Sequence, residues 1–263
     1  MIVDVNAAQA AESVPMPAFR LSIGKKVPVM AKLRLAIKKD GALQFLSHLD
    51  FARVVRLIII RAALPVAYSE GFNPHMKINF ASALGVGVSA DTEYMDMELL
   101  EECAAADVVR RMNEQAPDGF AVLDGAYMDA KAPKLMAMAN YAVYEVQGPL
   151  TRPVATAELT QLLATFNHLD SVTYEKVSPK SHKTRTINVK EHLIEPLQGR
   201  MEGERLFLRF AVLQTEKGAI KPLQVWELLA EKFSFPIDKE LMLARRTALY
   251  HREKGVNYSL FSI

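Results

Sequence analysis

The sequence predicts an α+β protein made of two tandem ferredoxin-like domains, each with the element order βαββαβ and an antiparallel sheet. Two patterns support this fold class: segments with alternating apolar residues are separated by apolar helical segments, and the same order of elements occurs twice after residue 30. Length supports it as well, because 263 residues, half of them hydrophobic, suffice for two domains with their own cores.

The chain divides into three predicted parts. Residues 1–29 contain Pro, Ala and Gly without a sustained period, so we expect a flexible extension there, with Met30 as a candidate natural start. The first domain is expected over 30–130 and the second over 131–263. The net charge is −4 over 31–130 and +5 over 131–263, which makes the second domain the better surface for a polyanion.

The first domain opens with a strand at 31–39, where Leu33, Leu35 and Ile37 alternate with charged residues. A helix follows from Ser47, which can cap it, to Leu64, because a proline at 65 disfavours a helical residue before it. The remaining elements of this domain are expected to be strands at 66–69, 77–81, 93–100 and 119–128 and a helix at 103–115.

The second domain follows a linker at 131–140 and repeats this order without a residue-level repeat. Its best-defined elements are the alternating strand 205–213 and the helix 222–233, which has a proline in its first turn. The other expected elements are strands at 141–147, 171–177, 185–189 and 249–252 and a helix at 155–169.

The helix 47–64 is more apolar than a helix that covers one sheet requires. We interpret this as coverage on more than one side, with the second domain packed beside it. The alternative is that its outer side is a docking surface for a partner protein.

The first candidate site is the start of this helix. Free N–H groups at a helix N-terminus favour an anion, so Ser47 and His48 are candidate phosphate contacts. The alternative is structural: Ser47 and Asp50 cap the helix, and His48 packs against the core.

The second candidate site is the loop between the predicted strands 66–69 and 77–81. Gly71 permits an unusual backbone there, a following Asn-Pro pair favours a turn, and an aromatic side chain in such a loop can stack on a base. The alternative is a connector whose phenylalanine fills the core. The candidate RNA-contacting or anion-contacting residues in and beside this loop are Tyr68, Phe72, Asn73, His75 and Lys77.

The third candidate site is a basic run with no acidic residue between Lys176 and Lys190. Lys180, Lys183 and Arg185 are its candidate phosphate contacts, on a hairpin or loop that faces solvent. The alternative is an ordinary solvated charge run.

Several classes of activity lack their motifs. There is no P-loop, GxGxxG, GxSxG or HExxH pattern, and Cys103 is the only cysteine, which excludes an internal disulfide, a CxxC zinc site and a cysteine-ligated iron–sulfur cluster. We therefore predict no metal and no cofactor, a reducing cytoplasm and no membrane span. No catalytic residue stands out; His48 and His75 are the candidates for acid–base chemistry.

The motifs FLSHLD and YSEGFNPH resemble those of the bacterial radical SAM-linked family, DUF2344, and the resemblance covers roughly residues 31–215. In that family the domain is fused to, or encoded beside, a radical SAM protein. The resemblance therefore implies an accessory role, with RNA as the expected target. A radical SAM enzyme needs three cysteines for its cluster, so this chain with one cysteine is not the radical enzyme itself.

Three functions follow as hypotheses. The first is an RNA-binding or substrate-presenting partner of a separate radical SAM protein, without catalytic activity of its own, in which His48 and the loop face the basic run across a cleft. The second is a metal-independent RNA endonuclease that uses His48 or His75, an analogy at the level of the fold. The third is a protein-docking module that binds no nucleic acid.

Overall fold

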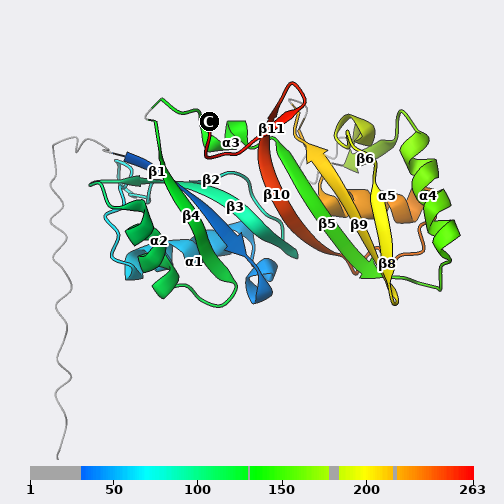
Figure 1. The fold of residues 1–263 in the computed structure, drawn as a ribbon, viewed down its shortest axis with the longest axis horizontal. Coiled ribbons are helices and arrows are strands. Elements are labelled where there is room, and N and C mark those ends of the chain that lie inside the picture. Colours follow the sequence, from blue (N-terminus) through cyan, green and yellow to red (C-terminus); the bar gives the residue numbers. More distant parts are fainter. Residues whose placement is uncertain (1–30, 130, 178–183, 216–217) are drawn as a thin grey trace, which may run out of the picture.

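The computed structural model describes residues 31–129, 131–177, 184–215 and 218–263, so the expected extension at 1–29 lies outside the described residues. Within them, one nine-stranded sheet runs through the molecule beside a two-stranded hairpin (Figure 1). Seven strands cross the sheet in the order β4-β1-β3-β10-β5-β9-β8, while β2 pairs with β3 and β11 with β10. The predicted α+β class is confirmed.

The first half of the chain forms one end of the sheet and packs two helices on one face. Its strand order, β4-β1-β3-β2, places the first and third strands in the middle. Its elements are β1 Ala31–Lys39, η1 Gly41–Phe45, α1 His48–Arg61, β2 Ile78–Phe80, β3 Val88–Leu99, α2 Ala105–Glu114 and β4 Phe120–Met128.

The second half has the corresponding order β10-β5-β9-β8, with the β6–β7 hairpin inserted after its first helix. A short helix, α3 Leu135–Met138, lies in the segment expected to be a linker. The elements that follow are β5 Tyr141–Pro149, α4 Thr156–His168, β6 Thr173–Val177, β7 Thr184–Asn188, η2 Val189–Glu191, β8 Gln198–Glu202, β9 Arg205–Leu213, α5 Pro222–Phe233, β10 Leu243–Glu253 and β11 Val256–Tyr258.

The two halves share one sheet, contrary to the expected pair of separate antiparallel sheets. The connection is β10, which pairs antiparallel with β5 on one side and parallel with β3 on the other. Ala244, Arg245 and Arg246 lie opposite Val88, Ser89 and Ala90 in this parallel segment. The last long strand of the chain therefore holds the first half against the second.

Strand β1 has the predicted bounds but is buried on both faces. Leu33, Leu35 and Ile37 are fully buried on one face, as their alternation predicts. Arg34 points to the other face and is also fully buried, because the C-terminal segment covers it: its Nη1 donates a hydrogen bond to the carbonyl oxygen of Leu260. Tyr94 on β3 contacts Phe261 edge-to-face at a centroid distance of 5.4 Å in the same layer.

Helix α1 packs on the sheet with one side only, so the prediction that it is covered on more than one side is wrong. Phe51, Val55 and Ile59 are buried against the sheet. On the opposite side, Leu49, Leu57 and Ile60 are 69%, 51% and 58% exposed. The helix also ends earlier than predicted, at Arg61, because the chain turns through Ala63 with a φ of 48° before it reaches the proline.

Candidate functional site

Ser47 caps helix α1. Its Oγ accepts a hydrogen bond from the Asp50 N–H at 3.2 Å and donates one to Asp50 Oδ2 at 2.7 Å. Asp50 Oδ1 accepts from Arg53 Nη1 at 2.9 Å. The capping interpretation is confirmed, and the carboxylate of Asp50 supplies the negative charge that a helix N-terminus favours.

His48 lies next to the cap and packs against β2. Its ring contacts Phe80 edge-to-face with a centroid distance of 5.2 Å. Partial burial lowers the pKa of His48, and the charges of Lys39 and Arg56 lower it further. The imidazole is therefore neutral at pH 7, and the packing interpretation of His48 is confirmed, while its role as a phosphate contact stays a prediction.

The loop Ser69–His75 is held in a defined conformation. The Ser69 N–H donates to the His75 carbonyl oxygen at 2.8 Å, and the His75 N–H donates to Ser69 Oγ at 2.9 Å. An isolated bridge pairs Tyr68 with Met76 just outside these bonds, and Gly71 turns the chain with a φ of 122°. The loop is thus closed at its base.

The side chains of this loop point to solvent. Phe72 is fully exposed, so the alternative in which this phenylalanine fills the core is wrong. Tyr68 is 39% exposed, and Asn73 and His75 are exposed beside it. Lys77 differs from its neighbours, because its Nζ pairs with Glu98 Oε2 at 2.9 Å and its charge is compensated.

The described contacts do not join His48 to the loop. His48 packs on Phe80, the last residue of β2, whereas His75 precedes the first residue of that strand by three positions. Five residues of extended chain span roughly 16 Å. Within the described residues, no hydrogen bond or ring contact links the two histidines. Direct contact between His48 and His75 therefore does not form the predicted common site.

The basic run falls largely outside the described residues, which include neither Lys180 nor Lys183. Arg185 is on β7, which pairs antiparallel with β6 in the predicted hairpin, with Arg185 opposite Lys176. The role of these three residues in binding stays a prediction.

A basic sheet surface that sequence reasoning missed lies across β8, β9 and β10. In β9, Leu206, Leu208 and Phe210 are buried on the side of α5, so the residues between them face the other side. The strand register places Arg200, Arg205, Phe207, Arg209 and Arg245 on that side, which we call the arginine face, and it places Glu145 and Glu202 among them.

Charges on the arginine face are partly compensated. Arg200 pairs with Glu145 and Glu202, and its guanidinium lies 4.5 Å from the ring centroid of Phe207. Arg245 pairs with Asp91 at 2.7 Å. Arg209 is exposed and has no acidic partner among the residues that the structure describes.

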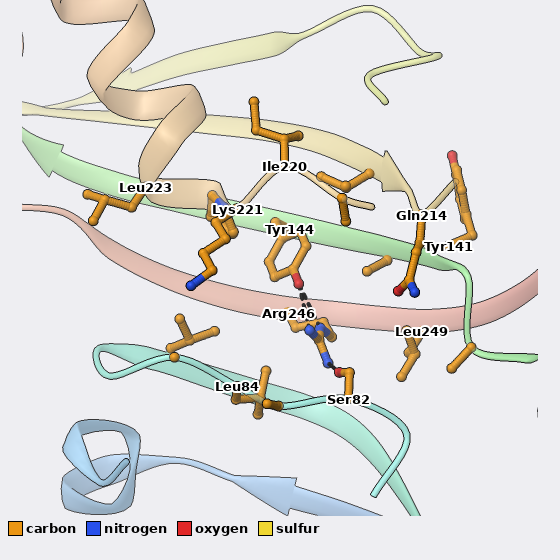
Figure 2. A pocket seen from close by; sticks show the side chains of 18 of the residues that line it. Ser82, Leu84, Tyr141, Tyr144, Gln214, Ile220, Lys221, Leu223, Arg246 and Leu249 are labelled. Carbon is orange, nitrogen blue, oxygen red and sulfur yellow. Dashed lines mark hydrogen bonds between the residues drawn. The ribbon is translucent and has the colours of Figure 1, made fainter. Parts of the chain in front are cut away.

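The second missed feature is a pocket on the helix-covered face, where the two halves meet. Its volume is about 820 Å³, and it lies between β5, β10, the start of α5 and the segment after β2 (Figure 2). Most of its walls are apolar. Residues from both halves line it, among them Leu84, Val88, Ala142, Ile220, Met242 and Leu249.

Arg246 forms the polar floor of this pocket. Tyr144 Oη accepts hydrogen bonds from Arg246 Nη2 at 2.6 Å and from Nε at 3.0 Å (Figure 2). Arg246 Nη1 donates to Ser82 Oγ at 2.6 Å and to the carboxylate of Glu93. Arg246 is 5% exposed and Glu93 is 1% exposed, so this is a buried ion pair at the junction of the halves.

Two kinds of feature are absent from the described residues. No group of three or more His, Cys, Asp or Glu side chains among them is placed to hold a metal ion. None of the helices described here has the length and apolar character to cross a bilayer.

Comparisons with solved structures find distant similarity. A chain of "Crystal Structure of a Cbf5-Nop10-Gar1 Complex" matches with a TM-score of 0.46 and 13% identity over 84% of this chain and 50% of its own. A chain of "Structure of H/ACA RNP bound to a substrate RNA containing 2'-deoxyuridine" gives 0.39 and 13%, over 82% and 47%. "An RAMP protein binding different RNA substrates" gives 0.19 and 8%, over 83% and 100%.

The chain thus spans about half the length of the first two of these structures. A search of curated proteins finds no match. One family model matches residues 32–222, which include the loop, α1 and most of both halves of the sheet. The chain therefore belongs to the family described as "Uncharacterized protein conserved in bacteria (DUF2344)".

Proposed function

We propose that this chain is an accessory protein that binds RNA, or presents an RNA substrate, for a separately encoded radical SAM protein. The observation that carries RNA binding is the exposure of Phe72 at the tip of a loop whose base is closed by hydrogen bonds. A solvent-exposed aromatic ring on an ordered loop is suited to stack on an unpaired base, and stacking contributes about 1–3 kcal/mol per base.

The arginine face supports the same proposal. An uncovered antiparallel sheet that carries arginines around an aromatic ring can contact phosphates and bases together. Arg209 is its best candidate for a phosphate contact, because in the described part of the chain its guanidinium has no acidic partner and, unlike that of Arg205, no hydrogen bond to Gln147.

The test is binding of a fluorescein-labelled, single-stranded RNA 20-mer of mixed sequence, followed by anisotropy. We expect Phe72→Ala to weaken binding roughly tenfold. Phe45→Ala is the matched control, because Phe45 is an exposed aromatic residue at 57% on a different element. Arg209→Gln should reduce the slope of log K against log salt concentration by the amount expected for about one phosphate contact. Absence of RNA binding by the unaltered chain would overturn the proposal.

The radical SAM partner is a separate step, which rests on the family resemblance and on the single cysteine. Affinity capture of the tagged chain from its own cell, with mass spectrometry and RNA sequencing of the eluate, tests it. Recovery of RNA without a radical SAM protein would leave RNA binding and remove the partnership.

Protein docking through α1 is the second candidate, because Leu49, Leu57 and Ile60 form an exposed apolar stripe. Arg56 and Arg61 lie beside this stripe and have no acidic partner among the described residues, so a partner segment with apolar and acidic residues fits it. Leu57→Ser with Ile60→Ser should abolish capture of that partner and leave RNA binding unchanged. No described contact favours the endonuclease alternative.

We also propose that 30–130 and 131–263 are two ferredoxin-like units. What supports this division is the corresponding strand order in the two halves, with the first and third strands central in each. Limited proteolysis should cut between them, around 129–134, before it cuts within either.

A further inference from the structure

The floor of the interface pocket has more hydrogen-bond donors than acceptors. Tyr144 Oη accepts two hydrogen bonds from Arg246, which leaves its own O–H free to donate. Ser82 Oγ accepts one from Arg246 Nη1, which leaves the serine O–H free in the same way. Arg246 has five N–H groups, and one on Nη2 is unused. Within the described residues, these three hydrogens have no acceptor.

The charge at the floor is already balanced. Glu93 accepts from Arg246 in a buried ion pair, so the floor does not require a further negative charge. A neutral acceptor, such as a carbonyl oxygen, can accept from donors that line the pocket without disturbing this pair. The floor therefore favours a ligand whose buried end carries one or more carbonyl groups.

The walls favour a largely apolar body. Leu84, Val88 and Ile220 contribute aliphatic side chains from three different segments, and the volume of about 820 Å³ lies within the range of small-molecule sites. A heterocyclic ring with its sugar fits such a space.

The mouth of the pocket carries a cation. Lys221 precedes the first turn of α5 and is exposed, and Figure 2 shows its side chain extending from the helix start toward β10 on the side of the pocket. Its ammonium group donates to no acceptor in the described part of the chain. Glu240 also lines the pocket, so the attraction for an anion is local to Lys221 and the positive end of α5.

We infer that this pocket binds a nucleotide with a carbonyl-bearing base, placing the carbonyl against Tyr144, Ser82 and Arg246 and the phosphate near Lys221. The inference rests on the proposed RNA-binding function, since the nucleotide can be one unstacked residue of an RNA chain or a free mononucleotide. It adds a third contact site, distinct from the Phe72 loop and the arginine face.

The experiment uses the whole chain and isothermal titration with UMP, uridine and AMP. We expect UMP to bind more tightly than AMP, because uracil presents two carbonyl oxygens and adenine presents none. Uridine should bind more weakly than UMP, because it lacks the phosphate that Lys221 contacts.

Two variants assign the contacts. Lys221→Gln should weaken UMP severalfold and leave uridine unchanged, whereas Lys134→Gln, an exposed lysine before α3, should change neither. Tyr144→Phe removes one donor and should weaken both ligands about fivefold to tenfold. Since this substitution also removes an acceptor from buried Arg246, a melting curve must show that the variant is folded; otherwise Lys221→Gln alone decides.

The source of the nucleotide is decided by repeating the titration with a uridine-rich RNA 8-mer. Binding of the 8-mer but not of UMP, weakened by Lys221→Gln, assigns an RNA residue to the pocket. Binding of UMP assigns a free nucleotide. RNA binding that depends on Phe72 but is unaffected by Lys221→Gln and Tyr144→Phe, without any UMP binding, overturns the pocket inference and leaves the proposed function intact. Failure to bind both UMP and the 8-mer overturns the pocket inference, whereas the proposed function is overturned only if the RNA 20-mer does not bind either.

Discussion

Arg34 on β1 and Asp96 on β3 form an ion pair that is withdrawn from solvent, with 2.7 Å between Nε and Oδ1 and 3.1 Å between Nη2 and Oδ2. The C-terminal segment completes the enclosure, because the Leu260 carbonyl oxygen accepts from Arg34 Nη1. The pair therefore links two neighbouring strands to the last residues of the chain.

Asp96→Ala should lower the free energy of unfolding by about 3–5 kcal/mol, because it leaves the guanidinium of Arg34 buried without its anion. Urea denaturation followed by circular dichroism measures this. Arg53→Ala is the control, since it breaks an exposed pair with Asp50 and should cost less than about 1 kcal/mol. Similar losses in both variants would show that the Arg34–Asp96 pair is not effectively buried.

The stability of the protein should fall as the pH drops from 7 to 5, in part because of His48. Burial, Lys39 and Arg56 lower the pKa of His48 in the folded chain, so the unfolded chain binds the proton more readily. The contribution of His48 is present above its ordinary pKa and is lost as the pH falls through the lower folded value. His48→Phe, which retains a ring against Phe80, should reduce this loss in urea denaturation at several pH values. Leu49→Gln should keep the wild-type pH dependence.

Gly148→Ala should destabilise the protein by about 2 kcal/mol through overpacking. A Cβ at this position would lie 2.5 Å from both the Leu241 carbonyl oxygen and Trp226 Cζ2. The indole cannot easily move away, since its Nε1 donates to the Asp238 carbonyl oxygen at 2.9 Å. Gly85→Ala serves as the comparison, because its nearest neighbour would be 3.8 Å away. Melting temperatures of the two variants should differ clearly.

Ser47→Ala should reduce stability by about 1 kcal/mol, since it leaves the Asp50 N–H at the start of α1 without its side-chain acceptor. Ser47→Thr should recover most of this loss, because a threonine hydroxyl can accept the same bond. Chemical denaturation compares the three proteins, and an alanine variant as stable as wild type would contradict the capping role.

Elements with a clear period were predictable from sequence alone. β1, β9 and α5 have the predicted bounds, because alternation or helical spacing coincides with one buried side. The sequence predicts β10 only over 249–252, since the charged residues Arg245 and Arg246 interrupt its apolar pattern. Arg246 is nevertheless buried, because Glu93 and Tyr144 compensate it.

The sequence predicts one of the candidate sites, the loop around Phe72, but not the pocket. The exposed loop around Phe72 was found because its composition exceeds what a connector requires. The pocket was missed, since Arg246 meets its partners Tyr144, Glu93 and Ser82 across 102, 153 and 164 positions of sequence. No local sequence pattern predicts contacts between residues so far apart in the sequence. Only the course of β10 across the sheet brings these residues together.

The position of β10 also has a consequence for biosynthesis. Residues 31–129 leave the ribosome well before β10 is translated, so the nascent first half must wait with the Val88–Ala90 edge of β3 unpaired and Glu93 without its guanidinium partner. The exposed edge is only three residues long, and a short edge limits pairing with other chains. Translation of β10 supplies both the missing strand and the guanidinium, so this edge of β3 closes only when the chain is nearly complete.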